Sequence, residues 1–122
     1  MSKFTNRKRK ASYSLEDIKQ CIRNNRYRIP SPRTRKNIYN KLGLVQEEVT
    51  NIILELKKND FVESMASYYK KEIWQDNYAP VTQHGKLYIK IRLDDQGCVI
   101  ISFDKYEDLD DEFRKLWNLP FL

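Results

Sequence analysis

The sequence lacks several features that would assign it to a common protein class. No apolar run approaches the roughly 20 residues that a membrane-spanning helix needs, and the basic N-terminus has no apolar stretch of the kind found in secretory signals. The single histidine, His84, excludes a mechanism in which two histidines exchange protons with a substrate. No set of carboxylates and no group of histidines and cysteines has the spacing of metal ligands. We therefore expect no membrane span, no metal and no cofactor.

Cysteine is also scarce. The two cysteines, Cys21 and Cys98, both fall in amphipathic segments. Free cysteines are commonly buried, and they persist as thiols in a reducing compartment. We predict that both are buried thiols of a cytoplasmic protein.

What the chain does have is a strong asymmetry of charge. Lys and Arg number 23 against 17 Asp and Glu, which gives a net charge of +6. Residues 1–41 hold 13 basic and 2 acidic side chains, whereas residues 42–122 hold 10 basic and 15 acidic ones. This asymmetry suggests a basic arm or face that meets a polyanion, and the alternative is a solubilising surface.

The length of 122 residues allows one domain with extensions. We assign residues 1–12 to a basic flexible arm, since residues 3–10 hold five basic and no acidic side chains. Residues 13–106 form the folded domain. Residues 107–122 form an acidic extension that we predict to be a short C-terminal helix.

Apolar residues spaced by three or four positions predict three helices in the first half of the chain. The first begins at Ser14, whose hydroxyl can cap free backbone amides. A short second helix follows Ser31 and ends at Gly43, and a third lies between Gly43 and Asn59.

From Phe61 onward the period of the apolar residues shortens towards two, which is typical of strands. We predict four strands, near residues 61–67, 73–79, 86–93 and 97–103. Short connections between consecutive strands favour antiparallel pairing. The predicted fold is α+β, with N-terminal helices on one face of a roughly four-stranded antiparallel sheet and a short C-terminal helix.

The third predicted strand alternates most clearly. One face carries Leu87, Ile89, Ile91 and Leu93, and the other carries Lys86, Tyr88, Lys90 and Arg92. Cations bind phosphates and aromatic rings stack on bases, so the second row could form a platform for RNA. On the alternation alone, an ordinary solvated strand face is the alternative.

Four ordered blocks in the second half of the chain resemble the MqsR family of toxins. The blocks are Phe61–Met65, Ile73–Pro80, Gly85–Ile91 and Val99–Phe103. The resemblance implies a compact domain like that of the RelE-type toxins and cleavage of single-stranded mRNA without a metal. It also implies a cognate antitoxin protein that neutralises the toxin.

The same resemblance implies site residues. The glutamine after the tryptophan corresponds to Gln75, and the tyrosine of the Gly-x-x-Tyr stretch corresponds to Tyr88. A lysine near the end of the last strand is most simply Lys105, although the direct register places Asp104 there. We expect the RNA-binding cations to be Lys70, Lys86, Lys90 and Arg92.

RNA carries its own nucleophile, the 2′-hydroxyl, so the protein must move protons and stabilise a crowded phosphate. We predict that Tyr88 acts in proton transfer or phosphate orientation and that Gln75 positions the ribose or a phosphate oxygen. The residues expected to stabilise charge are Lys90, Arg92 and Lys105.

Glu63 departs from the resemblance, because the family has a lysine after the aromatic of the first block. Either a neighbour such as Lys70 or Lys90 supplies the missing cation, or activity is weakened or lost. Glu63 could also be a general base. The main alternative function is therefore a catalytically impaired homologue that binds RNA or a protein partner.

Other residues have structural explanations. Trp74 and Tyr78 share a strand face opposite Gln75 and are expected in the core. His84 is expected on a surface loop, although an unperturbed histidine could assist as acid or base. The acidic tail could mask the basic platform, in which case deleting residues 107–122 raises RNA affinity at low salt.

Overall fold

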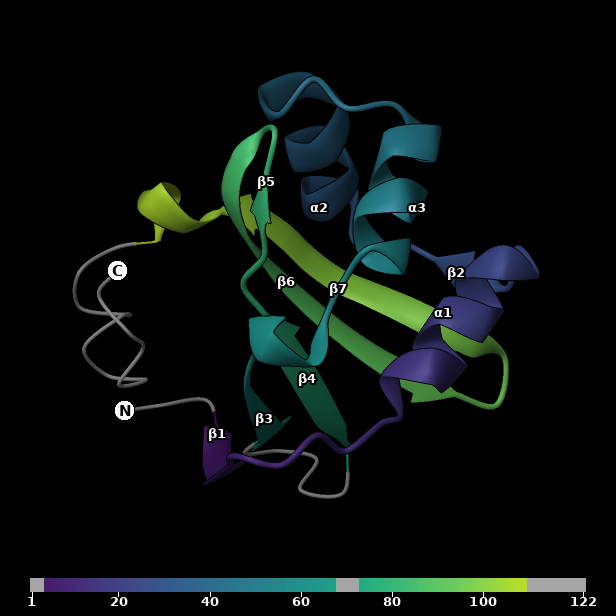
Figure 1. Ribbon diagram of the computed structural model, residues 1–122, viewed down its shortest axis with the longest axis vertical. Helices are drawn as coiled ribbons and strands as arrows, with labels where there is room; N and C mark the ends of the chain where they lie inside the picture. The colour runs from purple at the N-terminus through teal and green to yellow at the C-terminus, as the bar shows by residue number, and fades with distance from the viewer. Residues whose placement is uncertain (1–3, 68–72, 110–122) are drawn as a thin grey trace.

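Helices and strands separate into two layers. The computed structural model describes residues 4–67 and 73–109. The helical segments are α1 (Leu15–Arg23), α2 (Pro32–Lys36), the π-helical turn η1 (Asn37–Lys41), α3 (Gln46–Leu54) and the 3-10 turn η2 (Lys58–Asp60). Figure 1 shows α1, α2 and α3 grouped on one side of the sheet. The predicted α+β class is confirmed.

Local sequence signals fix where the first two helices begin. Ser14 Oγ accepts a hydrogen bond from the backbone N–H of Asp17 at 3.2 Å, and Ser31 Oγ accepts one from Thr34 at 3.3 Å. These caps satisfy amides that the first turn of a helix leaves unpaired. Gly43, with φ +66°, follows the second helical segment in the left-handed conformation that glycine adopts easily. The predicted boundaries at Ser14, Ser31 and Gly43 are confirmed.

The described residues form a sheet of seven strands. They are β1 (Phe4–Lys8), β2 (Tyr27–Arg28), β3 (Phe61–Ser67), β4 (Trp74–Tyr78), β5 (Val81–Thr82), β6 (Gly85–Asp94) and β7 (Gly97–Lys105). Their order is β1-β3-β4-β6-β7-β2, with β5 paired to β6. Only the pairing of β2 with β7 is parallel among these strands.

The four predicted strands are confirmed as β3, β4, β6 and β7, but the expected count of about four is wrong. The three additional strands have five residues or two. β2 and β5 are too short to show alternation, and β1 has the polar sequence Phe4-Thr5-Asn6-Arg7-Lys8, so their pairing is decided by the neighbouring strand.

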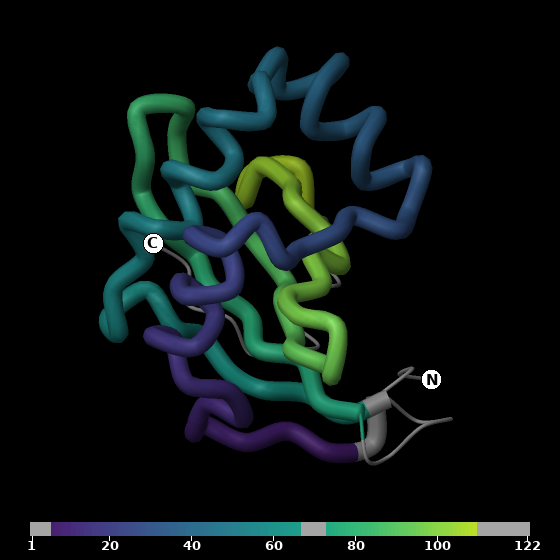
Figure 2. The backbone as a smooth tube through the Cα atoms, turned by 90° about the vertical axis from the view of Figure 1, so that its right-hand side faces the viewer, coloured from purple at the N-terminus to yellow at the C-terminus, as the bar shows by residue number. Residues whose placement is uncertain are grey.

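Residues 4–8 of the N-terminal arm form the strand β1. β1 pairs antiparallel with β3, and Figures 1 and 2 both place this purple segment at the edge of the sheet. Asp76 accepts backbone N–H groups of Ser12 at 3.0 Å and of Tyr13 at 2.9 Å, which ties the following segment to β4. Residues 4–8 therefore belong to the same sheet as the other strands. The edge of β3 offers them backbone hydrogen bonds, and the local sequence gives no sign of this pairing.

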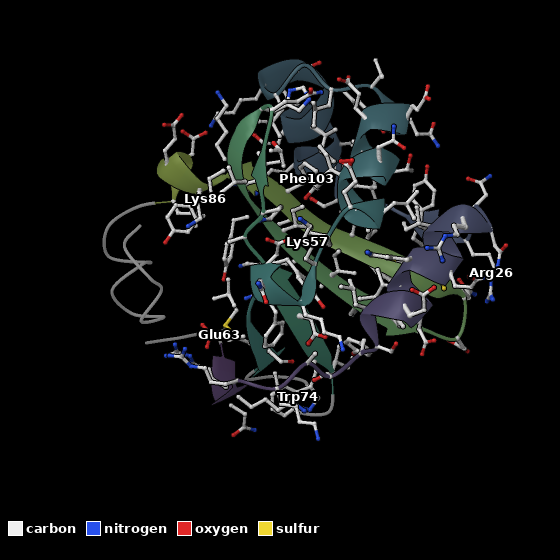
Figure 3. All side chains as sticks on the ribbon, in the orientation of Figure 1. Arg26, Lys57, Glu63, Trp74, Lys86 and Phe103 are labelled. Carbon is white, nitrogen blue, oxygen red and sulfur yellow. The ribbon has the colours of Figure 1, made fainter. Side chains whose placement is uncertain are left out.

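The main hydrophobic core lies between the helices and the sheet. As predicted, Leu87, Ile89 and Ile91 point into this core, where they pack with residues such as Ile18 of α1. Phe103 of β7, labelled in Figure 3, belongs to the same cluster. Tyr88 points the other way and packs in a smaller cluster on the opposite face.

The expectation that Trp74 and Tyr78 are both core residues is confirmed only for Tyr78. Tyr78 is 1% exposed and contacts Phe61 edge-to-face. Trp74 is half-buried, because it begins β4 at the end of the sheet, where Lys8 Nζ lies 4.3 Å from its ring centroid.

The cysteines are both free thiols, but only Cys98 is buried, and Cys21 is half-buried at the edge of the core. After β7 the chain makes a 3-10 turn, η3 (Tyr106–Asp108). The remainder of the predicted C-terminal helix and Lys70 lie outside the described residues. Within residues 4–67 and 73–109, no helix has both the length and the apolarity needed to cross a membrane.

Candidate functional site

A chain of buried polar side chains crosses the face of the sheet opposite to α1, α2 and α3. We call this surface the outer face; its residues include Arg7, Glu63, Met65, Gln75, Asn77, Tyr88, Lys90 and Ser102. Gln75 Nε2 donates to Asn77 Oδ1 at 3.3 Å, and Asn77 Nδ2 donates to the Tyr88 hydroxyl at 3.0 Å. Gln75 is 9% exposed, and Asn77 and Tyr88 are 0% exposed. The structure thus joins Gln75 and Tyr88 through Asn77, which the sequence analysis missed.

Tyr88 is held as a neutral phenol. Burial raises its pKa well above the ordinary value, although the hydrogen bond from Asn77 acts in the opposite direction. Its ring meets that of Tyr106 edge-to-face, with centroids 6.2 Å apart. A phenol that stays protonated at neutral pH can donate a proton or a hydrogen bond, but it is a poor base.

Glu63 lies directly opposite Asn77 across the β3–β4 ladder and is 3% exposed. Arg7 holds it with two hydrogen bonds, from Nε to Oε1 at 2.8 Å and from Nη2 to Oε2 at 3.2 Å. A buried carboxylate without a cation is costly, so this bidentate pair stabilises Glu63 where it is. The cation beside Glu63 is therefore Arg7, a residue absent from the predicted site. The signal in the sequence was Glu63 itself, because an acidic residue between Phe61 and Met65 on one side of a strand needs a cation beside it when it is buried.

Three of the predicted RNA-binding cations lie along the outer side of β6. Lys86 Nζ lies 4.3 Å from the centroid of the Tyr106 ring, and burial lowers its pKa. Figure 3 shows Lys86 beside the turn η3. Lys90 is directly opposite Asn77 on β4 and Ser102 on β7. Arg92 Nη1 lies 3.6 Å from a carboxylate oxygen of Asp94, near the turn between β6 and β7.

Ser102 adds a polar group beneath Lys90. Its hydroxyl oxygen is the one buried side-chain oxygen or nitrogen of the described residues that has no hydrogen-bond partner. Most buried polar groups in folded proteins are hydrogen-bonded, to protein or to ordered water. The outer face thus holds a buried hydroxyl beside the Gln75–Asn77–Tyr88 chain.

The third predicted catalytic residue, Lys105, is not brought to this site. It lies directly opposite Leu87 in the β6–β7 ladder, and opposed residues of an antiparallel pair point to the same face. Lys105 therefore leans towards the helices. Asp104 lies opposite Tyr88 instead, and its Oδ1 accepts a hydrogen bond from Asn37 Nδ2 at 2.9 Å.

A separate groove of about 1050 Å³ lies between α3 and the β5–β6 hairpin. Its lining includes Glu48, Glu55 and Asp60, whose charges oppose a polyanion. His84, in the loop where it was predicted, lines this groove with its Nε2 3.5 Å from Glu48 Oε2. In the part of the chain that the structure describes, no group of three or more His, Cys, Asp and Glu residues could hold a metal ion.

The sequence matches a known protein family and a relative within it. The sequence profile of the family described as "Motility quorum-sensing regulator, toxin of MqsA" matches residues 10–105. The mRNA interferase toxin MqsR of Escherichia coli strain K12 is 33% identical over 98 residues, which span 79% of this chain and 95% of that protein. The profile match covers Glu63, Gln75, Asn77 and Tyr88 but begins after Arg7.

Proposed function

This chain belongs to the MqsR toxin family, and from that premise we propose that it is an endoribonuclease that cleaves single-stranded mRNA. The observation that carries the proposal is the buried Gln75–Asn77–Tyr88 chain, with Lys86 and Lys90 on the same strand as Tyr88. Its partner would be a cognate antitoxin of the MqsA kind, and it would act in the cytoplasm. The domain would resemble the RelE-type toxins.

The proposed reaction uses the substrate's own nucleophile. The 2′-hydroxyl gives its proton to water as its oxygen attacks the adjacent phosphorus, the bond to the 5′-oxygen breaks, and that oxygen takes up a proton, so the products are a 2′,3′-cyclic phosphate and a 5′-hydroxyl. Tyr88, which stays protonated, would give a proton to the leaving 5′-oxygen or a hydrogen bond to the phosphate. A positioned acid contributes about 100- to 10,000-fold to the rate.

The other side chains would orient and neutralise the substrate. The amide of Gln75 would hold the ribose or a phosphate oxygen, and Lys86, Lys90 and Arg92 would bind phosphates along β6. Because Tyr88 is fully buried, RNA must displace groups that cover it, among them Tyr106. The catalytic role of Lys105 stays a prediction, and the cleavage rate of the Lys105→Ala variant tests it.

The test is a cleavage assay in EDTA. Purified protein, Tyr88→Phe and Gln75→Ala are each incubated with an end-labelled single-stranded RNA, and the products are separated on a sequencing gel. We expect the wild-type protein to cut in EDTA and to leave a cyclic phosphate, and both variants to cut more slowly. Cleavage rates that are equal in all three proteins would rule out the assigned roles, and cleavage that EDTA abolishes would rule out the metal-free route.

A second function is favoured by one observation. Acidic residues stand both at position 63 and opposite Tyr88 at position 104, so the site carries fewer cations than the resemblance implies. A catalytically impaired homologue would bind RNA or its antitoxin and cut nothing. Bound but intact RNA in the same assay supports this alternative.

A further inference from the structure

A short segment that follows β7 lies against Tyr88 on the outer face. We call residues 106–109 the strap; it consists of the turn η3 and of Leu109, whose N–H donates to the Tyr106 carbonyl at 3.1 Å. Tyr106 is 8% exposed and forms one cluster with Tyr88 and Met65, and Leu109 packs against the same cluster. The strap therefore covers part of the surface on which the proposed reaction takes place.

Two cations hold the strap in this position. Lys86 Nζ lies 4.3 Å from the centroid of the Tyr106 ring, and Figure 3 shows Lys86 beside the turn. Lys41 Nζ lies 2.9 Å from Asp108 Oδ2, which ties the strap to the turn η1. Lys86 is one of the residues to which we assign a phosphate contact. The closed strap thus engages a group that the RNA would use.

The strap begins where the family match ends. The matched segment is 10–105, and Tyr106 is the next residue. Gln75, Asn77 and Tyr88 lie within the match, whereas the ring that lies against Tyr88 comes from outside it. The sequence suggested masking of the cations by acidic side chains. In the structure an aromatic ring makes the contacts with Tyr88 and with Lys86.

We propose that the strap is an autoinhibitory segment, which covers Tyr88 and engages Lys86 in the free protein and lifts away when RNA binds. This inference rests on the proposed function, because it concerns access to the same site. The Tyr106 ring and a nucleotide of the RNA compete for one surface. The apparent affinity for RNA is therefore the intrinsic affinity reduced by the fraction of molecules whose strap is open.

The contacts of the strap suit a segment that can open. The Lys41 and Asp108 side chains are 56% and 34% exposed, and exposed ion pairs stabilise only weakly. Tyr106 belongs to the small cluster on the outer face and not to the main core under the helices. Segments held by few buried apolar contacts open more readily than the core does. Lifting the strap therefore leaves the main core intact.

The experiment measures single-turnover cleavage of an end-labelled RNA over a range of protein concentrations, with thermal unfolding as a check on the fold. If about 1–10% of molecules are open, Tyr106→Ala should lower the half-saturating protein concentration by about 10- to 100-fold. The maximal rate should stay within about 3-fold of wild type, because saturating RNA opens the strap in both proteins. A purely structural role of Tyr106 would not lower the half-saturating concentration.

A second variant tests the ion pair without removing a ring. Asp108→Asn should lower the half-saturating concentration by about 3-fold, since the pair with Lys41 is exposed. The matched control is Glu107→Gln, which removes an equal charge from the adjacent exposed residue. It reports the general effect of one negative charge on RNA binding, and it should change the concentration less than Asp108→Asn does.

Three outcomes would overturn the strap and leave the proposed function standing. One is a Tyr106→Ala variant with an unchanged half-saturating concentration. Another is a Tyr106→Ala variant that needs more protein or has a maximal rate more than about 10-fold lower, because Tyr106 would then help to hold the RNA. If Tyr106→Ala does not fold, the third decides: equal effects of Asp108→Asn and Glu107→Gln.

Binding separates this inference from a failure of the proposed function. If the wild-type protein cuts no RNA, the affinities of the same four proteins for a 2′-O-methyl RNA are measured by fluorescence anisotropy. Tighter binding by Tyr106→Ala than by wild type would support the strap and contradict only the cleavage. Equal or weaker binding by Tyr106→Ala, or no binding by either protein, would overturn the strap as well.

Discussion

The two faces of the sheet give β6 different surroundings. Under the helices, Leu87, Ile89 and Ile91 belong to the main hydrophobic cluster, and the polar residues Ser64 and Asp76 are buried on the same face. The outer face buries Tyr88 with Asn77, Gln75 and Glu63, whereas Arg7, which pairs with Glu63, keeps 32% of its side chain exposed. Burying apolar side chains stabilises a fold, whereas burying polar groups at best breaks even. The helix-covered face therefore supplies most of the stability of the fold, and the outer face is the one to which we assign the proposed function.

The largest expected effect is the loss of stability caused by a substitution in the helix-covered core. Phe103→Ala removes a fully buried ring and should lower the free energy of unfolding by about 3–5 kcal/mol, measured by urea denaturation. Val81→Ala is the control, since Val81 is 81% exposed and should change stability by about 0.5 kcal/mol or less. A loss below about 1 kcal/mol for Phe103→Ala would mean that this face is not the folding core.

The next effect compares one substitution on the two faces. Tyr88→Phe should reduce RNA cleavage by about 100-fold or more, because it removes the proposed proton donor. Tyr78→Phe removes a hydroxyl from the helix-covered face and should leave cleavage within about 2-fold of wild type, since Tyr78 is equally buried but points to the core. Single-turnover assays measure both. Equal losses would show that buried hydroxyls act through stability alone.

A smaller effect concerns pH at the rim of the outer face. Arg28 Nη2 lies 2.5 Å from Asp94 Oδ2, and this hydrogen bond lowers the pKa of Asp94 to about 2. Because the pKa is depressed in the folded state, the stabilisation is present above about pH 4 and is lost as pH falls through about 2. Asp94→Asn should therefore unfold at a lower temperature at pH 7, and its difference from wild type should shrink below about pH 4 and vanish only below about pH 2. A difference that stays constant with pH would contradict the assignment.

The smallest effect concerns binding. Lys86→Ala should reduce the salt slope of RNA binding by about 0.7, which is the loss of one phosphate contact on a single strand. Lys57→Ala removes an equal charge from the groove between α3 and the β5–β6 hairpin and should leave the slope unchanged. Fluorescence anisotropy with a labelled RNA measures both slopes. A larger change for Lys57→Ala would place the RNA at the groove and contradict binding on the outer face. Figure 3 labels both lysines.

Part of the candidate site could be predicted from the sequence. Tyr88 was found because a strand with alternating apolar residues fixes which side each residue faces, and Gln75 because its block resembles a known family. Asn77 was missed, since nothing local marks it as the link between them. Asp104 and Lys105 are adjacent, and only the β6–β7 register decides which of them lies opposite Tyr88.

The sequence by itself determined the helix-covered face, since periodicity, the Ser14 and Ser31 caps and Gly43 are local signals that hold whatever the rest of the chain does. The tertiary structure alone decided which residues from other strands join Tyr88 on the outer face. Arg7 and Glu63 are 56 residues apart, and no local preference records their pairing. The physical reason is that β1 forms only when the edge of β3 offers its backbone hydrogen bonds, and the buried charge on Glu63 then selects Arg7.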